Sequence, residues 1–249
     1  MRNYLLSILL GLTTTVAVWV PLPVKAEAKV YQEVSGEDSI RFDAEGFDEL
    51  KSLGLSLASP EDTTEPDPGY TYGLGLLPPS SDPSVRGTTL AFSYDDVTKT
   101  YIPLGGIEQF SGSLVFNVDT TKLALPPELK LGNLSVAFSP DYKFFFSTGT
   151  VANGLRLFDV DSSGNPTVDL NSQTWTLEPV SLKISQDFSN YLVAAGASKP
   201  TAGLEIIDAR GYRSFVEAGA TSVPEPDGAL PILTAGAALV WRMRKRKAA

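Results

Sequence analysis

Gly112-Ser-Leu-Val-Phe-Asn-Val-Asp119 places Leu114, Phe116 and Val118 on one side of an extended chain. Apolar residues at every second position are typical of a β-strand that buries one face. The glycine before this run and the aspartate after it are residues that favour turns. We therefore expect an antiparallel strand here, with these three side chains in a core.

The same period of two recurs along most of the interior. It appears at Ile40/Phe42, Leu53/Leu55/Leu57, Leu90/Phe92/Tyr94, Leu134/Val136/Phe138, Trp175/Leu177, Leu182/Ile184 and Leu204/Ile206. Only the segments 46–53 and 187–192 are expected to form a helical turn. At least eight short strands predict an all-β fold over residues 27–217, an antiparallel β-sandwich or jelly-roll-like ectodomain.

Residues 59–87 interrupt this pattern with six prolines, which lack the backbone donor that a strand ladder needs. We expect a long loop or insertion here. It is either a binding loop or a mobile one, and we favour the mobile loop.

A β-propeller is the alternative fold. Phe92-Ser-Tyr-Asp95, Phe138-Ser-Pro-Asp141 and Ile184-Ser-Gln-Asp187 recur at a spacing of 46, and propeller blades have periods in the forties. A second set of similar segments, which begin at Gly112, Gly154 and Gly203, has unequal spacings of 42 and 49. The sandwich is therefore preferred.

Composition excludes several kinds of catalysis. The 249 residues contain no cysteine and no histidine, so Ser-His-Asp, Cys-His and HExxH chemistry are ruled out. Residues 27–226 carry 13 basic and 28 acidic residues, a net charge near −15. Such a surface repels nucleic acid and anionic lipid, and it suits an extracellular protein or one that associates with divalent cations.

The N-terminus has the pattern of a signal peptide. Arg2 precedes the apolar run 4–20, and Val24 and Ala26 supply the small residues of a cleavage site. We expect the Sec export machinery to recognise residues 1–26 and signal peptidase to cut after Ala26. Cleavage after Ala28, for which Ala26 and Ala28 supply the small residues, and a permanent N-terminal anchor are the alternatives.

The C-terminal segment 218–249 combines three features in order. Pro224-Glu225-Pro226 is followed by the apolar stretch 228–241 and then by a basic end at 242–249, whose charges are Arg242, Arg244, Lys245, Arg246 and Lys247. A helix of 14 residues is about 21 Å long, whereas the hydrocarbon core of a membrane is about 30 Å thick. The helix is therefore expected to span only marginally, with its basic end in the cytoplasm.

This order resembles the PEP-CTERM sorting signal of Gram-negative bacteria. The resemblance implies that Pro224, Glu225 and Pro226 are recognised in the inner membrane by an exosortase-type membrane protease, which cuts there and releases the protein. It also implies a transient stay in the inner membrane, then the cell surface or the extracellular polysaccharide matrix. An ordinary single-span anchor is the alternative.

Residues 105–215 resemble the β-rich ectodomains that often precede such tails. The segments that carry this likeness are 112–119, the run that ends at Phe138, 154–159 and 187–192. Such ectodomains generally lack an assigned activity, so the likeness concerns fold and location.

A calcium site is a further hypothesis. Asp159, Asp161 and Ser163 supply oxygens at positions 1, 3 and 5 of an EF-hand-like loop, and Gly164 occupies position 6. Position 12 is Leu170, where a bidentate glutamate is required, and a hairpin turn explains the same residues. We therefore expect no obligatory cofactor, with weak Ca²⁺ binding as the alternative.

Sugar binding is a competing role for the ectodomain. Tyr70, Tyr72, Tyr101 and Tyr142 lie at or near expected loops, where aromatic rings can stack on sugars. A polysaccharide hydrolase based on two carboxylates is a third candidate, although no signature pairs any two of them. We predict a non-catalytic, exported surface or matrix protein that acts near extracellular polysaccharide and binds no nucleic acid.

Overall fold

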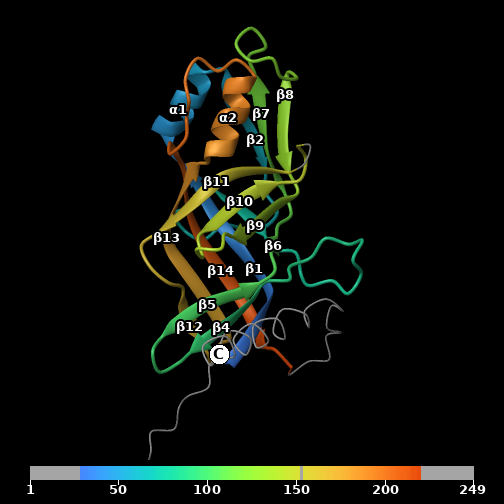
Figure 1. The fold of residues 1–249 in the computed structure, drawn as a ribbon, viewed down its shortest axis with the longest axis vertical. Helices are drawn as coiled ribbons and strands as arrows, with labels where there is room; N and C mark the ends of the chain where they lie inside the picture. The colour runs from blue at the N-terminus through green and yellow to red at the C-terminus, as the bar shows by residue number, and fades with distance from the viewer. Residues whose placement is uncertain (1–28, 152–153, 220–249) are drawn as a thin grey trace, which may run out of the picture.

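The computed structural model describes residues 29–151 and 154–219 of the chain. They form an elongated arrangement of strands with two short helices (Figure 1). Every strand pairing in this part of the chain is antiparallel, so the predicted all-β, antiparallel class is confirmed.

Eleven strands make up the larger sheet. They are β1 (Lys29–Phe42), β3 (Tyr72–Gly75), β4 (Ala91–Asp95), β5 (Thr100–Gly105), β6 (Glu108–Gln109), β9 (Leu134–Phe138), β10 (Phe144–Thr148), β11 (Leu155–Ser162), β12 (Thr167–Asp169), β13 (Thr174–Ile184) and β14 (Glu205–Glu217). Their hydrogen-bonded order is β5-β4-β1-β14-β13-β11-β10-β9-β6, while β3 pairs with β1 and β12 pairs with β13.

The larger sheet is curled. Arg213 on β14 lies five strand positions from Glu108 on β6, which would put the two strands about 24 Å apart in a flat sheet. Their side chains nevertheless meet at 2.8 Å. The sheet therefore bends until its β6 edge faces β14, and the concave side becomes an interior.

A three-stranded sheet completes the fold, in the order β2 (Leu55–Glu61), β7 (Ser113–Val118), β8 (Glu128–Gly132). The alternation in β7 acts as predicted, because Leu114, Phe116 and Val118 are all buried. This sheet lies with the helices at the top of Figure 1, whereas β4, β5 and β12 lie at the opposite end.

Two helices form where the sequence predicted helical turns. In α1 (Ala44–Ser52), the Asp43 carboxylate accepts a hydrogen bond from the Gly46 amide at 2.7 Å. In α2 (Gln186–Ala194), the Ser185 hydroxyl accepts one from the Phe188 amide at 3.1 Å. Both caps satisfy amides that have no partner within the helix.

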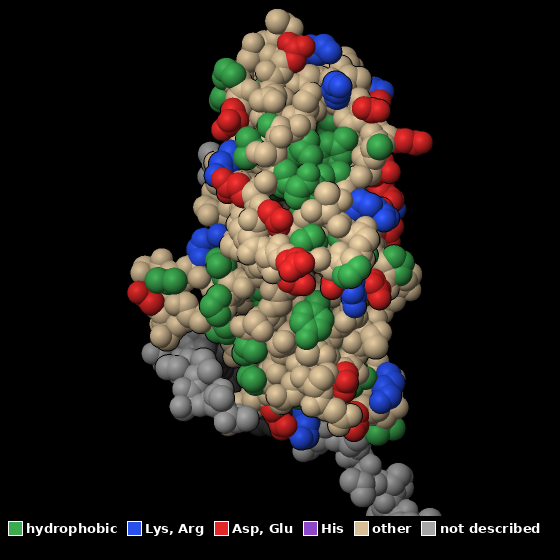
Figure 2. Space-filling model, turned by 180° about the vertical axis from the view of Figure 1, so that it is seen from behind, with side chains coloured by type: hydrophobic (Ala, Val, Ile, Leu, Met, Phe, Trp, Pro, Cys, Tyr) green, Lys and Arg blue, Asp and Glu red, His purple; other side chains and the backbone are tan. Residues whose placement is uncertain are grey.

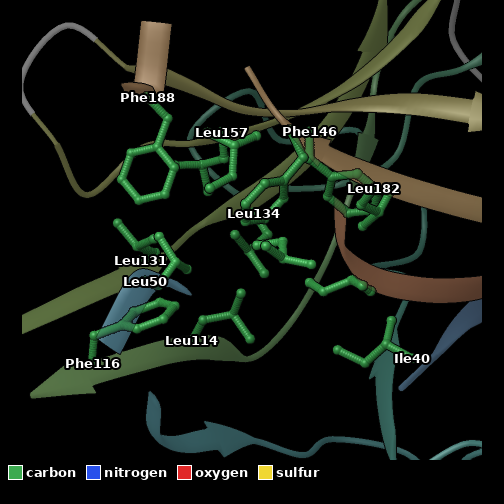
Figure 3. Packing of buried hydrophobic residues seen from close by; sticks show 14 of the residues in the cluster. Ile40, Leu50, Leu114, Phe116, Leu131, Leu134, Phe146, Leu157, Leu182 and Phe188 are labelled. Atoms are coloured by element: carbon green, nitrogen blue, oxygen red, sulfur yellow. The ribbon is translucent and has the colours of Figure 1, made fainter. Parts of the chain in front are cut away.

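Both sheets and both helices contribute to the main hydrophobic core (Figure 3). Leu50 of α1 and Phe188 of α2 are buried with Phe116 of the small sheet and Leu182 of the large one. A second, mainly aromatic cluster lies toward the other end, and its members are Tyr31, Leu90, Phe92, Tyr94, Tyr101, Trp175 and Phe215.

The segment 59–87 is more regular than expected. It contributes the end of β2 and all of β3, where Leu74 is 3% exposed and the strand pairs with β1. Pro60 is accommodated because β2 is an edge strand. The prediction of a loop is therefore wrong for these two strands.

The propeller alternative is also wrong for the part of the chain that the structure describes. A propeller repeats four-stranded sheets around an axis, whereas these strands divide into one sheet of eleven and one of three. The repeats that suggested a propeller fall on different parts of the two sheets: the segment that begins at Gly112 forms β7 of the small sheet, and the one that begins at Gly154 contains β11 of the large sheet.

Charged side chains of both signs are scattered over the face seen in Figure 2, with hydrophobic side chains in separate patches between them. In the described residues no helix is both long enough and apolar enough to cross a membrane.

Candidate functional site

A buried ionic cluster lies on the concave side of the curled sheet. The Arg213 guanidinium donates two parallel hydrogen bonds to Glu108, from Nε at 2.9 Å and from Nη2 at 2.8 Å. Nη2 also lies 2.9 Å from the Asp38 carboxylate. Nη1 donates to the backbone carbonyls of Glu37 and Tyr212. Arg213 thus links β14 to β1 and β6.

A third carboxyl group, that of Glu33, is fully buried beside these residues. The Trp175 indole donates to Glu33 Oε1 at 3.0 Å, while Glu33 Oε2 has no hydrogen-bond partner. Burial and the nearby Glu108 raise the pKa of Glu33 well above its ordinary value. The neutral acid form of Glu33 is therefore favoured.

Charge in the cluster is unbalanced, since three carboxyl groups share one guanidinium. Burial raises the pKa of Asp38 to about 6, although Arg213 opposes that shift. Burial disfavours the charged form of Arg213 as well, but Asp38 and Glu108 outweigh it and raise the pKa of the guanidinium. The cluster is a tightly bonded interior network that retains protons.

A small cavity of about 40 Å³ adjoins this network. Asp38, Glu108 and Arg213 form part of its wall, and apolar side chains form most of the rest. Such a volume suits one or a few water molecules rather than an organic substrate.

A larger groove of about 360 Å³ opens next to the cavity. The two share three lining residues, Phe144, Pro166 and Leu177. The remaining residues of the groove are Tyr101, Ile102, Pro103, Tyr142, Ser162, Gly164 and Asn165. The edge strand β5 forms one side, and the turns after β9 and β11 contribute to the other. We call this site the tyrosine groove.

Tyr142 is the most exposed aromatic residue of the tyrosine groove, with 59% of its surface accessible. Its backbone has φ = 62°, which is uncommon for a residue other than glycine. The Tyr142 amide donates to the Ser139 carbonyl at 2.8 Å, and the Ser139 amide donates to Lys143 at 2.9 Å. Its ring stacks on Phe138. The turn therefore holds this ring in a fixed position.

Tyr101 forms an inner wall of the tyrosine groove and is only 6% exposed. Its ring stacks on Phe92 at 4.6 Å and meets Trp175 edge-on at 6.1 Å. The hydroxyl group is buried and has no hydrogen-bond partner. Burial, together with the nearby Glu33, raises the pKa of this phenol well above its ordinary value.

The structure thus brings together two of the four tyrosines considered for sugar binding. Tyr101 and Tyr142 line the same groove. Tyr70 and Tyr72 lie in and beside β3, and Tyr72 packs on Phe42 with ring centroids 5.2 Å apart. These two belong to a different part of the molecule.

The residues considered for calcium binding lie on β11 and in the turn after it. Asp159 accepts from Arg156 Nε at 2.7 Å, and Asp161 accepts from Lys183 Nζ at 2.5 Å. Ser163 follows in the turn. Each carboxylate already has a cationic partner. Both residues lie on the strand β11 and not in a loop that could wrap around one ion. In the described residues no group of three or more acidic side chains is arranged to hold a metal.

The sorting residues fall outside the described part of the chain. Ala26 precedes residue 29, and Pro224, Glu225, Pro226 and the basic end follow residue 219. Their predicted roles therefore stay predictions.

A larger surface hollow, about 740 Å³, lies between α1 and the segment 199–205. Two of its acidic residues have roles in the fold, because Asp43 caps α1 and Glu49 forms an ion pair with Lys199. We therefore regard the tyrosine groove as the better candidate site.

Sequence reasoning missed the buried ionic cluster, although a signal was present. Arg213 has the same strand phase as Ile207, Ala209 and Phe215, so an arginine occupies a position expected to face the core. A charged residue in a core position needs a buried partner. The sequence alone could not identify Glu108, because that contact depends on the curl of the sheet.

A scan against protein-family models and searches of curated proteins and solved structures each found no match for this chain. The class of the domain is therefore defined by its own fold and site: a curled antiparallel sheet with a buried ionic network and an exposed aromatic groove.

Proposed function

We propose that this chain is an exported, non-catalytic protein of the cell surface or extracellular matrix, associated with exopolysaccharide. In this proposal an exosortase-type membrane protease recognises the tail and removes it after a transient stay in the inner membrane. The ectodomain belongs to the sandwich or jelly-roll-like class, a proposal supported by the main hydrophobic core, to which both sheets contribute.

One observation carries the proposal. An apolar N-terminal run with a small-residue exit occurs in the same chain as Pro224-Glu225-Pro226, a short apolar stretch and a basic end. The marginal length of residues 228–241 suits a temporary membrane hold better than a permanent one.

The state of the carboxyl groups supports a non-catalytic role. A carboxylate hydrolase needs two acidic groups on either side of an open substrate site. Glu33, Asp38 and Glu108 are instead buried, and Arg213 is bonded to two of them. A carboxylate-based hydrolase is therefore the third candidate.

Mass spectrometry of the mature protein from native cells tests the proposal. We expect a chain that begins at Glu27 and ends before residue 228. A mature protein that retains residues 228–249 would falsify exosortase-type processing and would indicate a permanent anchor.

A carbohydrate- or Ca²⁺-binding surface module is the second candidate function. The exposed aromatic lining of the tyrosine groove favours carbohydrate. For Ca²⁺ the candidate ligands are Asp159, Asp161 and Ser163, and two of these are occupied by ion pairs.

A further inference from the structure

We propose that the tyrosine groove binds a neutral polysaccharide, with a hexopyranose ring stacked on Tyr142. This inference deepens the carbohydrate-binding candidate and rests on the proposed export, which would deliver the domain to extracellular polysaccharide.

The tyrosine groove exposes an aromatic ring and an aliphatic side chain to water. Tyr142 is 59% exposed, and Ile102 on the edge strand is 40% exposed. An aromatic face held open to water loses its hydration when the apolar C–H face of a sugar covers it. The groove therefore offers the surface that a stacked pyranose ring needs.

The lining of the tyrosine groove is uncharged. None of the ten residues that line the groove is charged, although residues 27–226 as a whole are strongly acidic. The charged residues next to the lining in sequence are all ion-paired, Asp141 with Lys143 at 3.3 Å, Asp161 with Lys183 at 2.5 Å and Glu178 with Arg210 at 3.1 Å. An acidic glycan would find no free cation here and would meet a repulsive field. A neutral glycan meets neither obstacle.

Polar side chains line the tyrosine groove beside its aromatic rings. Asn165 is exposed and carries both an amide donor and an amide acceptor, and Ser162 donates to the Gly164 carbonyl at 3.2 Å. Sugar hydroxyls can exchange hydrogen bonds with such groups. A few polar groups around an apolar wall are the usual composition of a small-ligand site.

The tyrosine groove is large enough for a sugar, and its walls are well ordered. A volume of about 360 Å³ falls in the range of ligand sites, about 300–1,000 Å³. The turn at Tyr142 is fixed by two backbone hydrogen bonds, and Tyr101 is packed against Phe92 and Trp175. A site that is ordered before binding loses little conformational entropy when the ligand arrives.

The test is a titration of the full-length protein, purified in detergent, with neutral hexasaccharides of glucose, mannose and galactose, and with an acidic oligogalacturonate of equal length. Isothermal calorimetry measures each affinity. We expect at least one neutral hexasaccharide to bind and the acidic one to bind more weakly.

The decisive variant is Tyr142→Asn, because asparagine accepts a positive φ and therefore removes the ring without straining the turn. We expect it to weaken binding by about tenfold or more. Tyr142→Phe should retain binding because it keeps the ring. Tyr212→Asn is the matched control, since Tyr212 is also exposed but lies on β14 outside the groove.

Three results would overturn the proposal. They are no binding of any neutral hexasaccharide, unchanged affinity in Tyr142→Asn, and tighter binding of the acidic oligosaccharide. Self-association that Tyr142→Asn abolishes, without sugar binding, would assign the groove to a second copy of the chain instead. Retention of the tail in cells would refute the export route and leave a positive titration standing, so the two proposals can fail separately.

Discussion

At the scale of single residues, Arg213 determines how the curled sheet closes. Its guanidinium bonds Asp38 on β1 and Glu108 on β6, and all three side chains are buried. Removing one partner of such a buried pair costs about 3–5 kcal/mol, because the other charge is left uncompensated. These ion pairs thus hold β1 and β6 in place relative to β14, and breaking either one strongly destabilises the fold.

The same residues make stability depend on pH. Asp38 and Glu33 have higher pKa values in the folded protein than their ordinary values of 3.8 and 4.5, so the folded state binds more protons than the unfolded state. The contribution of Asp38 is complete below about pH 4 and is lost as the pH rises through 6. That of Glu33 is likewise lost as the pH rises above its ordinary pKa of 4.5. Surface groups with lowered pKa, such as Asp95 and Asp119, have the opposite effect. They stabilise the folded state when they are ionised, and this contribution is lost as the pH falls below their ordinary pKa of 3.8.

We therefore predict that the free energy of unfolding falls by about 1–3 kcal/mol between pH 4 and pH 7. Glu33→Gln should reduce this fall, because glutamine cannot ionise and still accepts from Trp175. Urea unfolding at a series of pH values measures both. Glu65→Gln is the control, since Glu65 is exposed. An identical pH dependence in Glu33→Gln and the unchanged protein would contradict the assignment.

At the scale of secondary-structure elements, local signals predicted which strands and helices exist better than where they begin and end, since β1, expected at Ile40 and Phe42, already begins at Lys29. The runs at 175–177 and 182–184 were expected as two strands but form one, β13. Its register shifts between Leu177 and Val180, where Pro179 lacks a backbone donor. The strands β5, β8 and β10 were not predicted, although Leu129/Leu131 in β8 and Phe144/Phe146 in β10 alternate in the same way as the predicted runs.

Helix α2 offers a test of local stabilisation. The Ser185 hydroxyl accepts from the Phe188 amide and donates to the Arg156 carbonyl at 2.7 Å, and the residue is 1% exposed. We expect Ser185→Ala to lower the free energy of unfolding by about 1–2 kcal/mol, because it leaves two buried backbone groups without partners. Ser52→Ala, at the exposed end of α1, should change it by less than about 0.5 kcal/mol. Equal effects of the two substitutions in urea unfolding would refute this role for Ser185.

At the scale of the whole molecule, the proposed route predicts where a tail variant accumulates. Replacing Glu225 with glutamine removes the charge of the sorting motif and should trap the protein in the inner membrane. Asp227→Asn is the matched control, because it removes a neighbouring acidic charge outside the motif. Fractionation of cells followed by immunoblotting measures both. Unchanged release of the Glu225→Gln protein would show that the motif is incidental.

The sequence by itself determined the antiparallel all-β class, the positions of both helices and the exclusion of histidine and cysteine chemistry. Each of these depends on local periodicity, on capping residues or on composition, and all three are visible in one dimension. It also raised the hypotheses about the two termini, which concern residues outside 29–219.

Only the tertiary structure decided which polar and aromatic residues meet. Arg213 and Glu108 are 105 residues apart, and they come together only because an eleven-stranded sheet curls. The same curl brings Tyr101 of β5 to the groove that Tyr142 lines, and it leaves Tyr70 and Tyr72 elsewhere. Strand order and curvature follow from long-range pairing and packing. The local alternation of residues in a strand does not specify which other strands it pairs with.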